Sequence, residues 1–461
     1  MSVLEQILTA TRKKIERKKQ KTPLDFMMRE AEKNRTKSQF VDKILARKGA
    51  AIIAEIKNSR PNAPCFSTTL SFGERMRRYE KGGASAISIV VEEKFFGGSP
   101  QMVSEAKRHS SLPILYKDFI LDPYQIYEAK AYGADAILLI AKIINDRNLR
   151  YFAELAKKIG LEPVVEVQTE TELKQALGTQ SRCIAVNARN LHTLEVDREH
   201  AIRIGKLIPR DRFFVAFSGV ENKKNFTDYV KAGARAVLVG SVLMESDSPD
   251  MILEKFINPV KVKICGVQTK SAALTASRYG ADFLGFIFVK GKKRTIDPLV
   301  ANKIIESLPK GAQTVGVFAD APFADVITVA KKLHLSAVQL HGDESPSYVK
   351  RVRKYVPVWK AFRLSYHLSA KKIERMLKDY EAEYFLIDRL DRASKSLPME
   401  TLGVLGSRYP IALAGGLTPD TVKDAVSIAQ PSVVDVSSGV ERNGEKDSEL
   451  IKQFIKNAKS I

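Results

Sequence analysis

The sequence predicts an α/β protein built from two tandem (β/α)8 TIM barrels, and three observations support this fold class. The chain has 461 residues, which exceeds the roughly 250 residues of a single barrel. Each half contains eight short apolar runs separated by stretches with helical periodicity. A Gly-Ala pair follows a helical stretch and opens the next apolar run at Gly83, Gly133, Gly233 and Gly280. Strands that alternate with helices in this number favour barrels.

The apolar runs are the predicted strands. They are rich in Val, Ile and Leu, as strands buried on both faces are. In the first half they lie at 50–57, 85–92, 112–120, 135–141, 162–168, 183–190, 213–220 and 236–244. In the second half they lie at 261–266, 283–289, 313–319, 337–342, 357–363, 384–389, 410–417 and 433–440. A doubly wound sheet is the alternative, but it needs only about five or six strands in each half.

The boundary between the two barrels is expected between Glu254 and Val260. There a helical pattern ends and a new first strand begins, which predicts domains at residues 1–255 and 256–461. The first fifty residues precede the first predicted strand. We therefore expect them to form additional helices that cap the first barrel.

The chain is basic, with 75 Lys and Arg against 53 Asp and Glu and a formal net charge of +22. Nucleic-acid-binding proteins usually concentrate positive charge on one stripe or tail, whereas here the excess is spread along the chain. We therefore expect no nucleic-acid partner. We interpret the charge as a lysine-rich surface that also attracts anionic small molecules.

The three cysteines are too few for a disulfide framework, which indicates a reducing compartment. No apolar run approaches the roughly 18 residues that a membrane span requires. The first residues form an amphipathic, charged pattern without a signal-peptide core. We expect a cytoplasmic, monomeric protein without a membrane partner.

Catalytic groups of such barrels lie at the carboxyl ends of the strands. Charged side chains in apolar strands are costly unless they are paired or used, and several that converge on one barrel mouth favour a site over isolated structural pairs. The last two strands commonly end in a phosphate site built from backbone N–H groups. The predicted strand ends of the first half carry Glu55, Lys57, Glu92, Lys117, Asp118, Glu166, Asn187, Arg189, Ser218, Gly219, Gly240 and Ser241.

Several strings of the first half resemble indole-3-glycerol-phosphate synthase: AEIK, LYKDFILDPYQIYEAKAYGADAILLI, PVVEVQTETEL, VNARNL, SGV and VLVGSVLM. That family closes an indole ring on carboxyphenylamino-deoxyribulose phosphate with loss of CO₂ and water. The resemblance implies Lys117 as general acid and Glu166 as general base. It also implies that Lys57 and Glu55 orient the substrate carboxylate and the charged network. The implied contacts to polar substrate groups come from Asn187, Arg189 and Ser218, and those to the phosphate from Arg60, Gly219, Gly240 and Ser241.

The first half departs from the family pattern in two places. Where the family has Ser-Pro-Ser, the chain has Arg60 followed by Pro61 and Asn62, and Arg60 offers a stronger donor fork for phosphate. Where the family has Glu-Ser-Gly at the seventh strand, the chain has Phe217 before Ser218. A phenyl ring cannot partner a lysine as a carboxylate does, so we expect slow ring closure and a gain in kcat/KM on Phe217→Glu.

The strand ends of the second half carry a different set of groups. A cysteine in an apolar strand is usually an inert core thiol, but a thiolate can abstract a proton if its pKa is lowered. Cys265 at the first strand end and Asp388 across the mouth form a plausible base and acid. The other candidates here are Arg294, Gln339, His341, Gly415, Gly416, Asp435, Ser437 and Ser438.

The second half is similar to phosphoribosylanthranilate isomerase through the strings KICG, QLHGDESPSYV, ALAGGLTPDTV and VDVSSGVERNGEKD. That family rearranges an aminoaldose to an aminoketose. The resemblance implies Cys265 as general base at C2′, Asp388 as general acid at the ring oxygen and Arg294 as partner of the anthranilate carboxylate. Gln339 and His341 are implied substrate contacts, and the implied phosphate contacts are Gly415, Gly416, Ser437 and Ser438. The family's Gly-rich loop after the acid is replaced here by RLDRASKSLPMETL.

The product of the isomerase reaction is the substrate of the ring closure. The two resemblances together predict a bifunctional enzyme of tryptophan biosynthesis that acts on phosphorylated small molecules. Neither chemistry needs a metal or an organic cofactor, and the sequence has no metal-ligand spacing. The alternative is a chain with one competent barrel and one retained as a scaffold, which Phe217 and the altered loop suggest.

Overall fold

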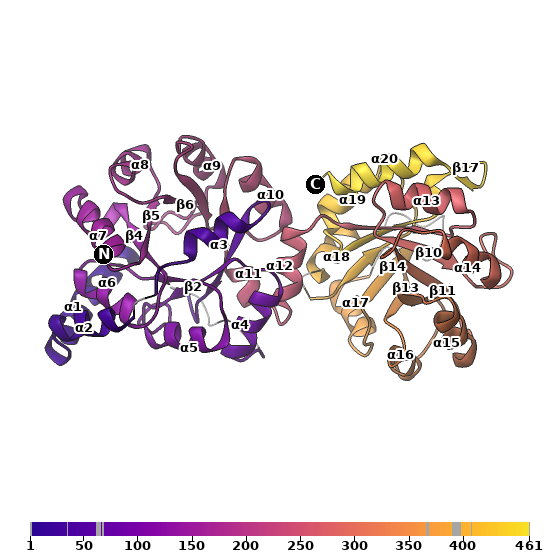
Figure 1. Cartoon of the computed structure of the whole chain (residues 1–461), viewed down its shortest axis with the longest axis horizontal. Coiled ribbons are helices and arrows are strands. Elements are labelled where there is room, and N and C mark those ends of the chain that lie inside the picture. Colours follow the sequence, from indigo (N-terminus) through magenta and orange to yellow (C-terminus); the bar gives the residue numbers. More distant parts are fainter. Residues whose placement is uncertain are drawn as a thin grey trace. The chain divides into compact units, whose positions relative to one another are not determined.

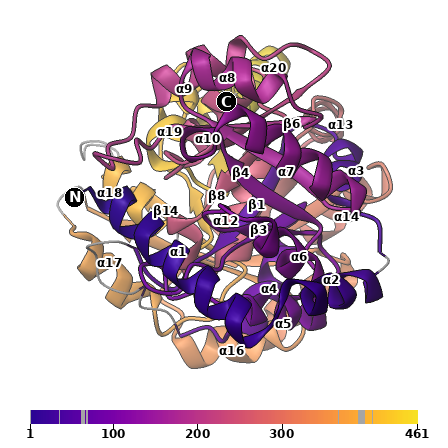
Figure 2. The same ribbon diagram turned by 90° about the vertical axis from the view of Figure 1, so that its left-hand side faces the viewer.

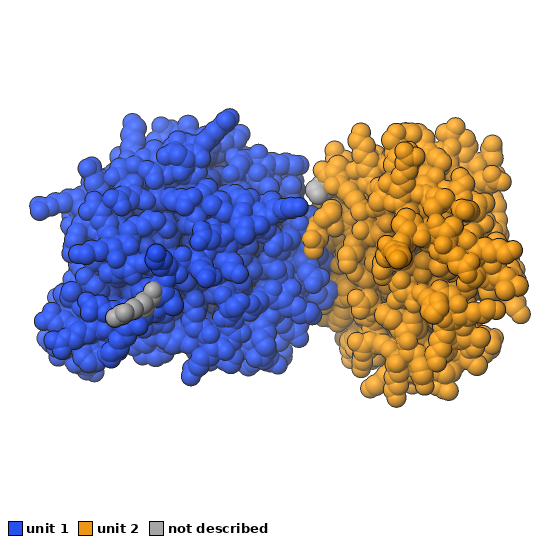
Figure 3. Space-filling view, viewed as in Figure 1, with its two compact units in different colours: residues 1–257 blue, residues 258–461 orange. Residues whose placement is uncertain are grey.

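The computed structural model of the chain divides into two compact units, residues 1–257 and 258–461 (Figure 3). The residues that it describes are 2–34, 36–60, 66, 69–365, 368–389, 398–406 and 408–460. Each unit contains a closed barrel of eight parallel strands (Figure 1).

The barrel of the first unit follows the order of the chain from β1 to β8, and β8 pairs with β1 to close it. Most strands are buried at every position, because the interior and the surrounding helices cover opposite faces. The strands are β1 (Ala51–Ile56), β2 (Ala86–Val90), β3 (Ile114–Lys117), β4 (Ala136–Ile140), β5 (Glu162–Val167), β6 (Cys183–Asn187), β7 (Phe213–Phe217) and β8 (Ala236–Val239).

Helices alternate with these strands around the outside of the barrel (Figures 1 and 2). They are α4 (Phe72–Lys81), α5 (Gln101–His109), α6 (Pro123–Ala131), η1 (Ala141–Ile143), α7 (Asp146–Lys158), α8 (Glu170–Leu177), α9 (Arg198–Lys206), α10 (Lys223–Lys231), α11 (Ser241–Met244) and α12 (Pro249–Ile257). The predicted Gly-Ala junctions are confirmed as left-handed turns, with φ of 86° at Gly83 and 94° at Gly133.

The first fifty residues form three further helices, α1 (Val3–Lys21), α2 (Leu24–Lys33) and α3 (Phe40–Ala46). Phe40 and Ile44 of α3 are buried in one cluster with interior strand residues such as Ala51. Arg235, which precedes β8, donates hydrogen bonds to backbone carbonyls at the end of α3. Helix α3 therefore covers the amino-terminal end of the barrel.

The barrel of the second unit is built in the same way and is closed by pairing of β16 with β9. Its strands are β9 (Lys261–Cys265), β10 (Phe283–Ile287), β11 (Gln313–Phe318), β12 (Ala337–Leu340), β13 (Val358–Leu364), β14 (Tyr384–Arg389), β15 (Ile411–Leu413) and β16 (Val433–Val436). Its helices are α13 (Lys270–Arg278), α14 (Pro298–Glu306), α15 (Phe323–Lys332), α16 (Pro346–Arg353), α17 (Ala370–Leu377), α18 (Met399–Leu405), α19 (Val422–Ala429), η2 (Ser438–Val440) and α20 (Ser448–Lys459).

All sixteen predicted strands are present, and the fold class is confirmed. The last two apolar runs were predicted too long, because β15 and β16 end before the glycine- and serine-rich turns that follow them. A small hairpin, β17 (Glu441–Arg442) with β18 (Glu445–Lys446), was not predicted. Among the described helices, none combines the length and the apolar character that crossing a membrane requires.

Candidate active sites

The mouth of the first barrel is lined by polar residues that continue the inward-facing rows of its strands. Ile53 on β1 and Leu115 on β3 lie in the interior cluster, and side chains alternate along a strand. Glu55 and Lys117, two residues further on, therefore face the interior at its carboxyl end. The same register brings Glu166 on β5 to the mouth.

Glu55 links two lysines. Its Oε1 lies 2.7 Å from Nζ of Lys57, and its Oε2 lies 3.5 Å from Nζ of Lys117. Burial alone would raise the pKa of this carboxyl, but the two ammonium groups outweigh it and lower the pKa of Glu55 to about 2. Glu55 is therefore ionised at neutral pH and holds both lysines at the mouth.

Glu166 has a different environment. Its carboxylate accepts a hydrogen bond of 2.9 Å from Nδ2 of Asn187. Burial raises the pKa of Glu166, and Lys117 and Asn187 oppose the rise only in part. One buried carboxyl is thus held ionised while the other is brought closer to neutrality, which is the separation that acid–base chemistry uses.

The ends of β7 and β8 are shaped by small residues. Ser218 and Gly219 have left-handed φ values of 67° and 74°, a conformation that is strained for serine and clusters at functional sites. A Cβ on Gly240 would lie 2.6 Å from Oε1 of Glu55, so this glycine leaves room for the carboxylate. Ser241 begins the short helix α11 directly after it.

The two arginines predicted for this site lie at its edge. Nη2 of Arg60 pairs with Glu245 at 3.2 Å, and its guanidinium lies over the ring of Phe66, so it reaches the end of α11. Nη1 of Arg189 donates to the carbonyl of Leu194 within its own exposed loop. The contact described for the Arg189 side chain is therefore not with Glu55, Lys57 or Lys117. Pro61 and Asn62 lie outside the described residues.

Two further strand-end carboxylates support loops. Glu92 accepts hydrogen bonds from three successive backbone N–H groups, those of residues 94–96. Asp118 accepts from the backbone of Phe119 and from the side chain of Gln125. These bonds satisfy two buried carboxylates without any ligand.

Phe217 lies at the mouth, as its register predicts. The side chain is 1% exposed, and its ring centroid is 5.8 Å from Nζ of Lys117. The ring offers the ammonium a cation–π contact, while Glu55 remains its carboxylate partner at 3.5 Å. Lys57 and Lys117 thus share the carboxylate of Glu55, and the ion pair of Lys117 is the longer of the two. A phenylalanine at position 217 gives Lys117 no second carboxylate.

We expect Phe217→Glu to raise kcat/KM for ring closure on the order of tenfold, since a hydrogen bond to a charged group is worth about 1.5–3 kcal/mol. The new carboxylate would give Lys117 its own partner and a fixed position. The measurement is steady-state ring closure by the full chain, with isomerisation by the same sample as a check on folding. Equal or lower ring closure with isomerisation intact would show that the phenyl ring belongs to a rearranged, competent site.

The mouth of the second barrel contains a fully buried lysine beside Cys265. Nζ of Lys263 lies 2.9 Å from Oδ2 of Asp435 and 2.9 Å from Oε1 of Gln339. A Cβ on Gly285 of β10 would lie 2.8 Å from Sγ of Cys265, so this glycine leaves space for the thiol. Despite its burial, the pKa of Lys263 is raised, because Asp435 and Cys265 stabilise its charge.

The condition that the pKa of Cys265 be lowered is not met in the free site. Burial raises the pKa of Cys265, and Asp435 adds to the rise, while the ammonium of Lys263 only opposes it. The free site therefore holds the thiol form at neutral pH. A thiolate formed there would contact the ammonium of Lys263.

Asp388 and His341 lie together at the same mouth. Nε2 of His341 is 3.6 Å from Oδ2 of Asp388, and Nδ1 of the same ring is 2.9 Å from Nε2 of Gln339. Burial raises the pKa of Asp388, although the backbone N–H of Arg389 donates to its Oδ1 and opposes the rise. A carboxyl group in this state can donate a proton nearer neutral pH than an exposed one.

Arg294 forms a bidentate ion pair with Glu441. Its Nε and Nη2 lie 2.6 and 2.7 Å from the two carboxylate oxygens of Glu441. Lys446 also contacts Glu441, at 2.8 Å. Burial would raise the pKa of Glu441, but these two cations lower it to about 2. The hairpin β17–β18 supplies both Glu441 and Lys446, and this partner of Arg294 was not predicted.

The last two strand ends again carry small residues. Gly415 has φ of 85°, and a Cβ there would lie 2.7 Å from Oδ1 of Asp388. Gly416 has φ of 79° and adjoins the guanidinium of Arg389. The hydroxyl of Ser437 donates to the carbonyl of Cys265, and Ser438 begins the short helix η2. The part of the loop after Asp388 at 390–397 lies outside the described residues.

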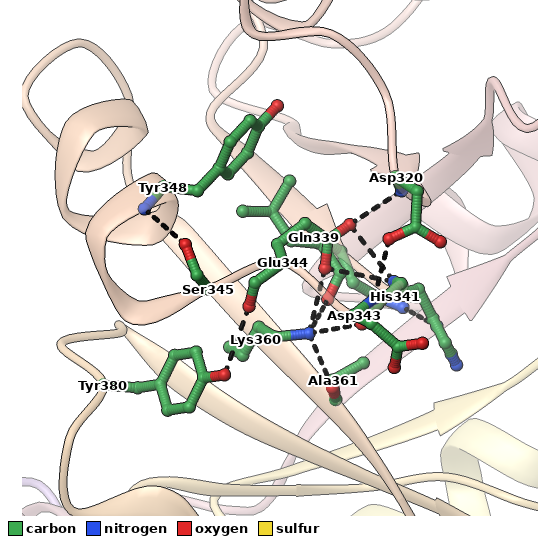
Figure 4. Close-up of polar contacts among 12 residues, drawn as sticks. Asp320, Gln339, His341, Asp343, Glu344, Ser345, Tyr348, Lys360, Ala361 and Tyr380 are labelled. Atoms are coloured by element: carbon green, nitrogen blue, oxygen red, sulfur yellow. Dashed lines mark hydrogen bonds and ion pairs between the residues drawn. The ribbon is translucent and has the colours of Figure 1, made fainter.

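The loop after β12 is held by a buried ion pair that sequence reasoning missed (Figure 4). Nζ of Lys360 lies 2.9 Å from Oε2 of Glu344 and donates to the carbonyl of Gly342 at 2.7 Å. Glu344 in turn accepts from the backbone N–H groups of Gly342 and Asp320. The available signal was a lysine within an apolar run, which requires a buried partner.

Two family models match the chain in tandem. The model described as indole-3-glycerol phosphate synthase matches residues 4–256, and the model described as N-(5′-phosphoribosyl)anthranilate (PRA) isomerase matches residues 262–457. The first covers the barrel with Lys117 and Glu166, and the second covers the barrel with Cys265 and Asp388.

Two relatives match most of this chain. A multifunctional tryptophan biosynthesis protein of Phycomyces blakesleeanus is 31% identical over 89% of this chain, which spans 63% of that protein's length. The tryptophan biosynthesis protein TrpCF of Vibrio cholerae is 33% identical over 81% of this chain and 78% of its own length. A crystal structure of phosphoribosylanthranilate isomerase from Thermotoga maritima is 37% identical and covers 44% of this chain and 100% of its own, with a TM-score of 0.40. The chain therefore belongs to the TrpCF family, with an indole-3-glycerol phosphate synthase domain followed by a phosphoribosylanthranilate isomerase domain.

Proposed function

We propose that the chain is a bifunctional enzyme that catalyses two consecutive steps of tryptophan biosynthesis. The second barrel isomerises N-(5-phosphoribosyl)anthranilate to carboxyphenylamino-deoxyribulose phosphate, and the first barrel converts this ketose to indole-3-glycerol phosphate, CO₂ and water. The observation that carries the proposal is that each barrel mouth holds its own acid–base groups. These are Lys117 with Glu166 in one and Cys265 with Asp388 in the other.

In the second barrel, Asp388 is the general acid and Cys265 is the general base. Asp388 gives its proton to the ring oxygen as the C1′–O bond breaks, and the nitrogen lone pair forms a C1′=N bond. The thiol of Cys265 first gives its proton to solvent, which leaves a thiolate beside the ammonium of Lys263. The thiolate takes the proton from C2′, and the C–H electrons form C1′=C2′ while the C=N pair returns to nitrogen. The enol oxygen then loses its proton as C1′ takes one up, which gives the ketone. Cys265 ends as the thiol and Asp388 regains its proton from solvent, so the transfers balance over one turnover.

In the first barrel, Lys117 is the general acid and Glu166 is the general base. Lys117 protonates the carbonyl oxygen as the new carbon–carbon bond forms at the ring carbon that carries the carboxylate. Lys57, held by Glu55, orients that carboxylate, which leaves as CO₂ while its bonding pair restores the aromatic ring. Lys117 regains a proton from solvent and gives it to the new hydroxyl group, which leaves as water. Glu166 accepts the proton that the neighbouring carbon loses as the hydroxyl departs. Polar substrate groups are bound by Asn187, Arg189 and Ser218. Asn187 also contacts Glu166.

Both substrates are phosphorylated, and both barrels offer a place for the phosphate at the ends of their last two strands. In such barrels the phosphate commonly binds there, at the backbone N–H groups of a short extra helix. The structure has α11 and η2 at these places. The proposed phosphate contacts are Arg60, Gly219, Gly240 and Ser241 in one barrel and Gly415, Gly416, Ser437 and Ser438 in the other.

The anthranilate carboxylate is proposed to bind Arg294, near Gln339 and His341. In the free site the guanidinium of Arg294 is paired with Glu441. The substrate carboxylate would therefore either displace Glu441 or bind Arg294 together with it. We further propose that the enzyme acts as a cytoplasmic monomer. The mass of the purified chain in solution, measured by sedimentation, tests the second part of that statement.

The test of the function supplies the full-length protein with each substrate separately. With the aminoaldose alone, both the ketose and indole-3-glycerol phosphate should appear in that order. With the ketose alone, only indole-3-glycerol phosphate and CO₂ should appear. Accumulation of the ketose without further reaction would contradict the proposal for the first barrel, and failure to consume the aminoaldose would contradict it for the second.

A further inference from the structure

We propose that Gln339 is a positioning residue that sets the tautomer of His341, so that the imidazole presents Nε2–H to the carboxyl group of Asp388. The inference deepens the proposed isomerase function and rests on it, because Asp388 is the general acid of that reaction. It concerns a line of hydrogen-bonding groups that crosses the mouth of the second barrel from Lys263 on β9 to Asp388 on β14.

The first step is the orientation of the Gln339 amide. An ammonium group has only donors, so the amide atom that lies 2.9 Å from Nζ of Lys263 is the acceptor Oε1. The reverse orientation would place an NH₂ group against an NH₃⁺ group in a site where Lys263 is 0% exposed. Lys263 therefore turns Nε2 of Gln339 away from itself.

The second step is the tautomer of His341. Nε2 of Gln339 lies 2.9 Å from Nδ1 of His341, and an amide nitrogen only donates. Nδ1 must therefore accept, and it carries no hydrogen. A neutral imidazole with a free Nδ1 carries its hydrogen on Nε2, which is the atom that faces Asp388.

The ring is neutral in this environment. Burial lowers the pKa of His341 to about 4, and the positive charges of Arg363, Lys263 and Lys360 contribute to the decrease. The carboxyl group of Asp388, whose own pKa is raised, is the acidic group that the ring faces at 3.6 Å. At neutral pH the imidazole thus has one hydrogen, and Gln339 determines where it lies.

The position of that hydrogen matters for the acid. With hydrogen on Nε2, the ring stabilises the carboxylate that remains after Asp388 has given its proton to the substrate. With hydrogen on Nδ1, the Nε2 lone pair would face Asp388 and compete with the substrate oxygen for that proton. Oδ1 of Asp388 already accepts from the backbone N–H of Arg389 at 2.8 Å, which leaves Oδ2 toward the ring.

The surrounding loop keeps the ring in place (Figure 4). Arg363 donates to the backbone carbonyl of His341 at 3.3 Å. Lys360 donates to the carbonyls of Leu340 and Gly342 on either side of it. The backbone around His341 is thus fixed from β13, so the amide and the imidazole meet in one arrangement.

The direct test is ¹⁵N NMR of the full-length protein labelled at its six histidines, because the two ring nitrogens of a neutral imidazole differ strongly in shift when one carries hydrogen. The spectrum of His341→Asn identifies the signals of His341 by their loss. We expect Nε2–H and an unprotonated Nδ1 in the native chain at neutral pH. In Gln339→Glu the carboxylate can accept from both Lys263 and the ring, so Nδ1 should become protonated.

Activity supplies the second readout. Gln339→Glu should lower kcat for isomerisation about tenfold or more, the size expected for loss of one hydrogen bond to a charged group, with a smaller change in KM. Ring closure by the same molecules should be unchanged. Gln313→Glu introduces the same charge at the exposed start of β11 and should alter neither activity nor the spectrum of His341.

The inference is overturned if His341 carries hydrogen on Nδ1 in the native chain, a measurement that needs no variant to fold. It is also overturned if Gln339→Glu moves the hydrogen to Nδ1 without lowering kcat. A native chain with no isomerase activity would instead contradict the proposed function, and the NMR result would still decide the tautomer.

Discussion

We expect Cys265→Ala to lower kcat/KM for isomerisation about 10²–10⁴-fold, the usual contribution of a general acid or base, and to leave ring closure unchanged. The thiol lies at the mouth of the second barrel beside the ammonium of Lys263, where no other described side chain is proposed to take the C2′ proton. Ring closure is proposed to use groups of the first barrel only. Both activities are measured on the full chain with separate substrates.

The matched control is Cys183→Ala, which removes the thiol of the other free, buried cysteine that the structure describes. Cys183 lies in the interior core of the first barrel, so this change should leave a small cavity and preserve isomerisation. Loss of both activities in folded Cys265→Ala protein would contradict the assignment of separate sites. Retained isomerisation would show that Cys265 is a core thiol.

Lys117→Ala should reduce ring closure about 10²–10⁴-fold while isomerisation continues at its native rate. Lys117 is the lysine that contacts Glu55, faces Phe217 and influences the pKa of Glu166, so it occupies the centre of the first mouth. The measurement is single-turnover ring closure, which separates chemistry from product release.

Lys107→Ala provides the matched control. Lys107 is also a paired lysine of the first unit, but its partner is Asp135, which precedes β4 at the opposite end of the barrel. Its removal should cost some stability and leave ring closure intact. A loss of less than tenfold in Lys117→Ala would mean that this lysine only supports the structure of the mouth.

The strands could be predicted from the sequence because a parallel barrel buries both faces of each strand. That burial produces apolar runs such as 135–141. The helix before this run ends at Ala131 and is followed by Gly133, whose φ of 94° favours glycine. The residues at the carboxyl ends then follow from the register, which is why Glu55, Lys117 and Phe217 could be placed together in advance. Their roles came from the resemblance to known families.

The contacts among site residues could not be predicted, because they join strands that lie far apart in the chain. Lys263 contacts Gln339 and Asp435, and nothing in the spacing of these residues specifies that pairing. The steric roles of Gly240 and Gly285 depend on side chains that approach from neighbouring strands. The sequence likewise does not specify that Glu441 contacts Arg294, because the hairpin β17–β18 sets that position.

The raised pKa of Cys265 also affects how fast this thiol is oxidised or alkylated. Peroxides and alkylating agents react with thiolates, and a buried thiol is attacked slowly. Cys265 is 6% exposed, and burial keeps it in the thiol form at neutral pH. The proposed base of the isomerase is therefore shielded from oxidative damage while its site is empty.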